Sequence, residues 1–403
     1  MKIIETLETP ITQHCDVLVC GGGFAGIAAA LAAARMGKQV LLLEKQYILG
    51  GLGTAGLITF YLPLCDGCGK QVSFGIAEEL LRLAADSAAE AGYPHNWLDE
   101  NDSSHRTIAD NRFELRYNPH TFALLVEQLL LNEGIHILYG TYAVGVHCEN
   151  RQIQAVITEN KSGRQAIAVG SVIDATGDCD IAHFANAPTE TFKQGNVLAG
   201  WYYSLCESDY QLNIVGYAEK RENQKSEKER QESKLRERFL GLNGEELSLM
   251  VQKSHAMTLK DLNAKRRHNN AFVPTSLASI PQIRMTRKIV GEYCLDDTEM
   301  HTFFSDSIGM VSDWRRRGPI YEVPFSTLYS KSVKNLVVAG RCTSVTESMW
   351  DIMRVIPCCA VTGQAAGTAA AMTTDFQTLD IHLLQTKLQS NGVVLHEQDL
   401  PIT

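Results

Sequence analysis

The sequence predicts an α/β fold with a central parallel sheet of the Rossmann type. The run Asp16–Cys20 is short and apolar, as a buried strand is, and Gln39–Lys45 contains a second such run that leads to the acidic residue Glu44. The stretch between them, from Phe24 to Met36, is rich in alanine and suits a helix packed tightly on a sheet. A strand, a helix and a second strand in this order form a βαβ unit, whose two strands are parallel.

The glycines between the first strand and the helix predict a site for a dinucleotide. Gly21, Gly23 and Gly26 have the spacing G-x-G-x-x-G. In that motif the first glycine allows a tight turn, the second lets the backbone approach a pyrophosphate, and the third lets helix and strand pack closely. The N-terminus of the helix faces the phosphate charge, and Glu44 lies where a carboxylate can bind ribose hydroxyls. A chance glycine turn in another α/β unit is the alternative.

Length and composition indicate a globular protein with two domains. The chain has 403 residues and a net charge of -9, which argues against a basic surface for nucleic acid. No apolar run reaches the length of a membrane span, and we find no N-terminal signal peptide pattern. The 11 cysteines are odd in number and scattered, which indicates reduced thiols in a cytoplasmic protein. The 12 histidines are also scattered, so we expect no metal site.

Three further segments bear on the cofactor, because the glycine motif alone does not separate FAD from NAD. Leu49–Thr54 is a second glycine cluster, Val172–Asp178 contains Ala-Thr-Gly, and Asn335–Arg341 is an apolar run that ends in Gly-Arg. With these segments the chain resembles the two-dinucleotide-binding-domain flavoproteins, which include the glutathione reductase, fumarate reductase and amine oxidase families. It is most similar to the bacterial FAD-dependent oxidoreductase family related to fumarate reductase flavoproteins, along nearly its whole length.

The resemblance implies that the cofactor is FAD, bound by a Rossmann-like domain in which a β-meander joins the parallel sheet. The helix that begins near Pro357 would point its N-terminus at the flavin pyrimidine ring and stabilise the anionic reduced flavin. The residues implied in FAD binding are Gly21, Gly23, Phe24, Ala25, Gly26, Glu44, Lys45, Gly51, Leu52, Thr54, Val144, Ala175, Thr176, Gly177, Asp178, Gly340, Arg341, Pro357, Gly363, Gln364 and Ala365.

The domain organisation that follows is discontinuous, with an inserted α+β substrate domain. We expect the FAD-binding domain in residues 1–60, 115–190 and 321–375, the substrate or cap domain in 61–114 and 191–320, and a C-terminal helix and tail in 376–403. Residues 92–112 are polar and predict a surface loop or a border of the active site. Residues 218–240 are almost entirely charged or polar, which predicts a solvated helix, with a lid or partner-binding arm as the alternative.

Five residues are candidates for the chemistry. Arg354 lies three residues before Pro357, where the resemblance places a guanidinium beside the flavin; a purely local role on backbone carbonyls is the alternative. Arg284 and Arg287, if helical, share one face and could bind a carboxylate or a polyhydroxylated substrate. Tyr321 and Glu322 could accept the substrate proton as hydride leaves.

These observations predict a cytoplasmic FAD-dependent oxidoreductase that transfers a hydride between flavin N5 and a small polar organic substrate. One alternative is a dithiol oxidoreductase using the C-x-x-C pair Cys65 and Cys68, although we find no second nucleotide-binding unit, of the kind that disulfide reductases use for NADPH, in the sequence. Another is a flavin-binding sensor or scaffold without turnover. The substrate, the direction of transfer, the electron acceptor and any homo-oligomer stay open.

Overall fold

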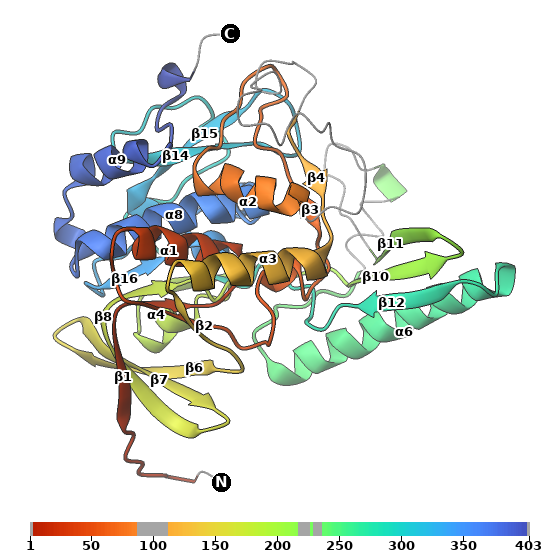
Figure 1. Ribbon diagram of the computed structural model, residues 1–403, viewed down its shortest axis with the longest axis horizontal. Coiled ribbons are helices and arrows are strands. Elements are labelled where there is room, and N and C mark those ends of the chain that lie inside the picture. Colours follow the sequence, from red (N-terminus) through yellow and green to blue (C-terminus); the bar gives the residue numbers. More distant parts are fainter. Residues whose placement is uncertain (1–2, 87–111, 217–225, 229–235, 401–403) are drawn as a thin grey trace. The chain divides into compact units, whose positions relative to one another are not determined.

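The computed structural model describes residues 3–86, 112–216, 226–228 and 236–400 (Figure 1). The chain divides into two compact units. The first unit contains Met1–Gly51, Thr59–Glu190 and Arg287–Thr403, and the second contains Leu52–Ile58 and Thr191–Thr286. Residues 61–86 and 287–320, which we expected in the substrate domain, lie in the first unit. Most of the polar stretches 92–112 and 218–240 lies outside the described residues.

The first unit is built on the predicted parallel sheet, with strand order β5-β2-β1-β8-β7-β6 and β16 paired to β8. The parallel strands are β1 (Ile11–Cys20), β2 (Val40–Leu43), β5 (His136–Leu138), β8 (Gly163–Asp174) and β16 (Leu336–Val338). The antiparallel strands β6 (Tyr142–Glu149) and β7 (Gln152–Asn160) form the meander that leads into β8. The predicted fold class is therefore confirmed, and the carboxyl ends of β1, β2, β8 and β16 meet at one edge of the sheet.

Helices α1 (Phe24–Arg35) and α8 (Ile356–Met372) pack side by side in the first unit, red and blue in Figure 1. Glycines on α8 make this approach possible. A Cβ atom built on Gly363 would lie 2.2 Å from the carbonyl oxygen of Ala25, and one on Gly367 would lie 2.1 Å from that of Ala29. The obstructing atoms belong to the backbone of α1, so a larger residue on α8 would have to push the two helices apart.

We expect Gly363→Ala to destabilise the protein by about 1–3 kcal/mol, the usual cost of overpacking a tight core. Alanine favours a helix over glycine by about 1 kcal/mol, so a loss of stability would have to come from the contact with α1. The matched control is Gly244→Ala at the start of α6 (Gly244–His268), because a Cβ there meets no atom within 4 Å. Urea unfolding should show a lower midpoint for Gly363→Ala alone, and equal midpoints would contradict the packing argument.

Further helices and strands complete the first unit around this sheet. The helices are α2 (Ile76–Asp86), α3 (Pro119–Asn132), α4 (Asp180–Phe184), α7 (Glu347–Met353) and α9 (Ile381–Ser390). The short strands are β3 (Phe60–Tyr61), β4 (Leu115–Arg116), β9 (Thr189–Thr191), β13 (Arg287–Ile289), β14 (Ser307–Ser312) and β15 (Ile320–Pro324); the last residue of β9, Thr191, is counted in the second unit. No single helix in the described ranges has the length and apolar composition of a membrane span; α7 and α8 pass that test only as a pair bent by 89°.

The second unit combines helix α6 with a three-stranded antiparallel sheet of order β11-β10-β12. Its strands are β10 (Ala199–Cys206), β11 (Asp209–Gly216) and β12 (Val273–Leu277). The Asn243 side chain caps α6 by accepting hydrogen bonds from the backbone N–H groups of Glu245 and Glu246. Tyr202 of β10 donates a 2.7 Å hydrogen bond to Asp261 of α6.

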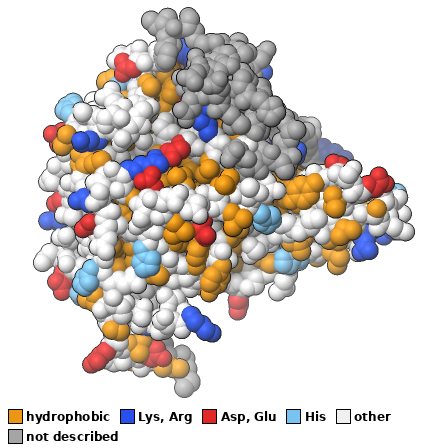
Figure 2. Space-filling view, viewed as in Figure 1, with side chains coloured by type: hydrophobic (Ala, Val, Ile, Leu, Met, Phe, Trp, Pro, Cys, Tyr) orange, Lys and Arg blue, Asp and Glu red, His pale blue; other side chains and the backbone are white. Residues whose placement is uncertain are grey.

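On the visible face in Figure 2, hydrophobic, acidic and basic side chains of the described residues are interspersed.

Candidate active site

The glycine turn between β1 and α1 combines two structural glycines with one that leaves space open. Gly21 has a φ of +111°, and its Cβ would lie 2.4 Å from the carbonyl oxygen of Ala175. A Cβ on Gly26 would lie 1.8 Å from the carbonyl oxygen of Gly21. A Cβ on Gly23, by contrast, would meet no atom within 4 Å. Gly23 is also the N-cap of α1 and makes no side-chain cap, so open space lies beside a helix N-terminus, as a bound pyrophosphate requires.

Glu44 is fixed next to this turn at the end of β2. Its side chain is buried, and its two oxygens accept hydrogen bonds from the backbone N–H groups of Gly22, at 2.8 Å, and Gln46, at 2.7 Å. Burial raises the pKa of Glu44, while these hydrogen bonds oppose the rise. The loop residue Gly51 also lies beside the turn, since its Cβ would be 3.3 Å from the Cα of Gly23. These residues fit the dinucleotide site that the motif predicts.

The loop after β8 is organised by Asp174, a residue that our sequence analysis did not assign to the site. Asp174 is fully buried and accepts hydrogen bonds from the N–H and hydroxyl of Thr176 and from the N–H of Ala182. Burial raises its pKa, and the same hydrogen bonds oppose the rise. An acid at the end of a buried strand was the signal that could have identified it, because such a carboxylate needs several donors.

Positive side chains surround the next residues of this loop. The guanidinium of Arg341 packs against Gly177, whose Cβ would lie 2.2 Å from Nη2 of Arg341. Asp178 lies 3.8 Å from that guanidinium and 3.9 Å from the amine of Lys45. Burial first, and then the charges of Asp178 and Asp174, raise the pKa of Asp180 to about 6. The loops after β8 and β16 therefore meet in one charged group of residues.

The first turns of α1 and α8 lie together at this edge of the sheet, and Gly340 lies between them. A Cβ on Gly340 would be 2.8 Å from Cβ of Ala25 and 3.3 Å from Sγ of Cys359. Val355, the N-cap of α8, provides no side-chain cap. Burial raises the pKa of the Cys359 thiol to about 12, although the charges of Arg341 and Arg354 act to lower it. Two helix N-termini and two guanidiniums thus place positive potential around one position.

Arg354 is held beside the first turn of α8. Its Nε and Nη2 donate to Oδ1 of Asp351, at 3.0 and 2.5 Å, and its guanidinium lies 5.9 Å from the ring centre of Trp314. The Trp314 indole donates to the carbonyl oxygen of Asp351 at 2.9 Å. Sγ of Cys359 donates to the carbonyl oxygen of Arg354 at 3.5 Å. Arg354 is only 12% exposed, and its Nη1 has no hydrogen-bond partner within the described part of the chain.

Arg284 and Arg287 do not share a helix face, and that expectation is wrong. The segment before β13 is not helical, and the two residues belong to different units. Arg287 forms an ion pair with Asp180 at 2.6 Å and donates to the carbonyl oxygen of Asp178 at 3.0 Å, so it supports the loop after β8. Arg284 lies over the Trp201 ring of the second unit, 5.3 Å from its centre.

Tyr321 and Glu322 are engaged by structural partners. The buried Tyr321 hydroxyl donates to the carbonyl oxygen of Asp297 at 3.0 Å. The Glu322 carboxylate accepts hydrogen bonds from the N–H groups of Phe304 and Glu397 and lies 2.9 Å from Nδ1 of His396. These contacts give both residues a role in holding the loops around β15.

The other predicted cofactor residues are distributed over both units. Gln364 accepts a 2.9 Å hydrogen bond from the N–H of Ile76 and so joins α8 to α2. Leu52 and Thr54 belong to the second unit, and Thr54 is buried. Val144 is on β6, Pro357 is in the first turn of α8, and Ala365 is buried in α8.

The C-x-x-C pair consists of one buried and one exposed thiol. Cys65 is 1% exposed, whereas Cys68 is exposed. Oδ1 of Asp66 accepts hydrogen bonds from the N–H groups of Cys68 and Lys70, which fixes a turn. Within the described residues, no group of three or more His, Cys, Asp and Glu side chains is arranged to hold a metal ion.

Comparison with curated relatives gives short matches. Urocanate reductase from Eggerthella lenta is 58% identical over 50 residues, which are 12% of this chain and 8% of that protein. Thioredoxin reductase from Ureaplasma parvum is 32% identical over 76 residues, which are 19% of this chain and 25% of that protein. The matched regions therefore span a quarter or less of the length of these two relatives.

Solved structures and a family model match much more of the chain. A geranylgeranyl bacteriochlorophyll reductase-like protein from Thermoplasma acidophilum aligns with 94% of this chain and 82% of its own, at 13% identity and a TM-score of 0.44. A flavin-dependent brominase aligns with 94% of this chain and 84% of its own, at 10% identity and a TM-score of 0.46. The family model "FAD dependent oxidoreductase" matches residues 16–237 and 208–388. The chain therefore belongs to the FAD-dependent oxidoreductase family and is an enzyme whose cofactor is FAD.

Proposed function

We propose that the enzyme transfers a hydride between FAD and a small polar organic substrate, and that Arg354 binds a negatively charged group during this reaction. The observation that carries the proposal is the state of Arg354. Its guanidinium is oriented by Asp351 and Trp314, while Nη1 has no hydrogen-bond partner among the described residues. A cation that is fixed in this way, with two N–H donors available, is suited to an anionic ligand.

Bound FAD supplies the hydride donor or acceptor, and the protein supplies orientation and electrostatics. Arg341 and the uncapped N-terminus of α8 have the same sign of potential as Arg354. All three would stabilise negative charge that develops near the first turn of α8. Fixed positive groups of this kind need no reorganisation during the reaction, so they favour the transition state over the ground state.

The dithiol and sensor alternatives have less support. The N–H of Cys65 is hydrogen-bonded to Arg112, and its side chain is almost fully buried, so an external disulfide would not reach it without a local opening. The G-x-G-x-x-G spacing recurs at residues 51–56, but there it follows no strand directly and opens no α-helix in the described chain, so it does not form a second unit to bind NADPH. A sensor without turnover would not require a guanidinium that is fixed beside α8 with N–H donors available to an anionic ligand.

The proposal is tested by mixing FAD-loaded protein, without oxygen, with panels of small carboxylates, alcohols and amines while the visible flavin absorbance is followed. We expect one chemical class to bleach the oxidised flavin, or an unsaturated member to reoxidise the photoreduced flavin. NADH and NADPH should not bleach it rapidly. The double substitution Cys65→Ser and Cys68→Ser should leave the response intact. Its loss in that variant would favour the dithiol mechanism, and no response to any compound would favour a sensor.

A further inference from the structure

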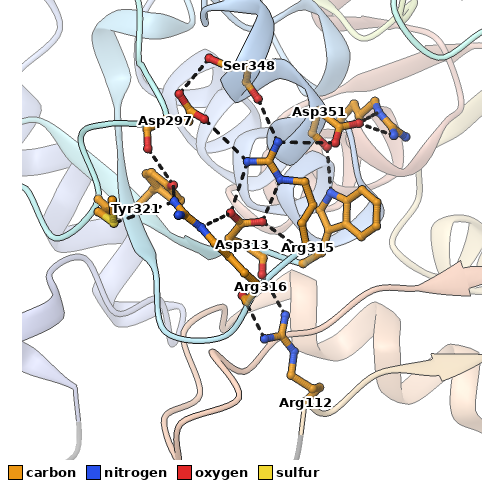
Figure 3. Close-up of polar contacts among 11 residues, drawn as sticks. Arg112, Asp297, Asp313, Arg315, Arg316, Tyr321, Ser348 and Asp351 are labelled. Atoms are coloured by element: carbon orange, nitrogen blue, oxygen red, sulfur yellow. Dashed lines mark hydrogen bonds and ion pairs between the residues drawn. The ribbon is translucent and has the colours of Figure 1, made fainter. Parts of the chain in front are cut away.

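Alternating charges connect the buried carboxylate of Asp313 to the Arg354 guanidinium. Nε of Arg315 donates to Asp313 at 3.0 Å, and Nη1 of Arg315 lies 3.7 Å from Oδ2 of Asp351 (Figure 3). The other oxygen of Asp351, Oδ1, accepts the hydrogen bonds from Arg354. Asp351 is therefore held between two arginines, and each of them takes a different oxygen.

Asp313 is a rigid anchor for this arrangement because it follows β14 directly and is fully buried. Its carboxylate also accepts hydrogen bonds from the N–H of Arg315 at 2.9 Å and from Nε of Arg316 at 3.0 Å, and its carbonyl oxygen accepts one from Arg112 at 2.9 Å (Figure 3). Burial by itself would raise the pKa of Asp313, but the hydrogen bonds and charges of Arg315 and Arg316 outweigh it, and the pKa lies below its ordinary value. The anchor is thus an ionised carboxylate.

The Asp351–Arg354 pair needs such support. The two residues are three positions apart near the end of α7, and Asp351 is 31% exposed. Pairs one helical turn apart are worth only about 0.3–0.5 kcal/mol on a helix surface, too little to hold a long side chain in one orientation without further contacts. The segment after Asp313 supplies the rest, because Trp314 lies under the Arg354 guanidinium and binds the Asp351 backbone, and Arg315 binds the Asp351 carboxylate.

We propose that Asp313 and Arg315 are positioning residues that orient Arg354 through Asp351 and so set the electrostatic potential at the flavin. This inference rests on the role of Arg354 proposed above. It assigns a function to the Asp-Trp-Arg-Arg segment, which otherwise has no part in the reaction. Arg315 also lies 3.8 Å from Asp297 and donates to the carbonyl oxygen of Ser348 at 3.5 Å, so its guanidinium is held on several sides (Figure 3).

The chain contains a matched control in Arg316. This residue binds the same Asp313 carboxylate, but its Nη2 is directed to the Tyr321 hydroxyl, at 3.4 Å, rather than to Asp351 (Figure 3). Replacing Arg316 thus removes a guanidinium contact from the same Asp313 carboxylate while leaving the Arg315–Asp351 contact in place. Lysine is the preferred substitution at both sites because it keeps the charge and removes the planar fork.

The first measurement is the reduction potential of bound FAD in Asp313→Asn, Arg315→Lys, Arg316→Lys and Arg354→Met. Loss of a nearby negative charge by itself would raise the potential in Asp313→Asn. If Asp313 instead positions Arg354, the reduction potential should fall in Asp313→Asn, because a disordered Arg354 no longer stabilises the reduced flavin. We expect Asp313→Asn and Arg315→Lys to lower the potential by part of the Arg354→Met shift, and Arg316→Lys to leave it unchanged. Asp313→Asn should cause no further fall when combined with Arg354→Met.

The second measurement needs no substrate and separates the two proposals. In FAD-loaded protein with ¹⁵N-labelled arginine, the Nε–H signal of Arg354 is assigned by its absence in Arg354→Met. We expect this signal to be sharp in the wild type and in Arg316→Lys, and broadened or lost in Arg315→Lys. Arg315→Lys therefore tests the positioning role even if Asp313→Asn fails to fold. A sharp signal in Arg315→Lys, or a raised potential in Asp313→Asn, would overturn the positioning role. A wild-type potential in Arg354→Met would instead overturn the proposed role of Arg354 at the flavin.

Discussion

Replacing Gly23 with valine is expected to abolish FAD binding and to leave the apoprotein folded. The Cβ of Gly23 would point into open space, with no protein atom within 4 Å. Gly23 has φ -73° and ψ 178°, an extended conformation that valine adopts readily. The added methyl groups therefore cost the fold little, but they occupy the space beside the N-terminus of α1 where the pyrophosphate is bound in the G-x-G-x-x-G motif.

The measurement is the FAD content after refolding or reconstitution with excess FAD and removal of unbound cofactor, with thermal unfolding of the apoprotein as the test of folding. Gly244→Val is a suitable control, since the Cβ of Gly244 also meets no atom within 4 Å and lies in the second unit. Gly26→Val would not test the same point, because its Cβ would overlap the carbonyl oxygen of Gly21 and disturb the fold itself. Stoichiometric FAD in a folded Gly23→Val protein would contradict the assignment.

The elements with strong local patterns were predictable from the sequence. The strand, glycine turn and helix of the first βαβ unit lie where the apolar runs and glycines indicated. The start of β1 was not predictable in this way: we expected the strand to begin at Asp16, but it begins at Ile11. Residues 11–15 are mostly exposed and polar, and they become a strand because they pair with the long strand β8, as in the register Ile11↔Ala166. Only the folded sheet supplies that partner.

The segment around Arg284 shows why a helical spacing can mislead. The segment is not helical, and its backbone is bound by groups distant in sequence. The Asn196 side chain accepts hydrogen bonds from the N–H groups of Arg284 and Met285, and the carbonyl oxygen of Thr286 accepts one from Phe192. A buried asparagine that satisfies these donors outweighs the weak local helix propensity.

The surroundings of Arg354 combine predictable and unpredictable parts. Its position before α8 follows from the segment order that the family resemblance implies. Its partners do not, because Trp314 and Arg315 reach it from a loop in a distant part of the chain; Trp314 and Asp351, for example, are 37 residues apart. Three consecutive arginines follow Trp314, and no sequence pattern indicates that Arg315 is the one that contacts Asp351. That distinction arises from the geometry after β14, where Asp313 orients Arg315 and Arg316 in different directions.

Arg354→Met is expected to keep FAD and the fold but to lose turnover by about a hundred- to thousandfold. Removal of one charge-stabilising donor from a site that excludes water costs about 2.7–4 kcal/mol of activation free energy. Methionine retains much of the packing of the arginine stem, so the lost groups are the charge and the N–H donors. The remaining positive groups, Arg341 and the N-terminus of α8, would account for the residual activity.

The measurement is the rate of flavin reduction in a single turnover, with the substrate class that the anaerobic screen identifies. Spectroelectrochemistry of the FAD-loaded variant should also give a lower reduction potential than in the wild type. Arg354→Lys should recover part of both losses, because it restores the charge without the fork. Arg35→Met is the control for removing an ion-paired guanidinium elsewhere, since Arg35 binds Glu79 and Glu133 at the end of α1. Wild-type reduction rates and potential in Arg354→Met would leave this arginine only its local contacts with Asp351 and Trp314, and the anion would then have to be bound elsewhere.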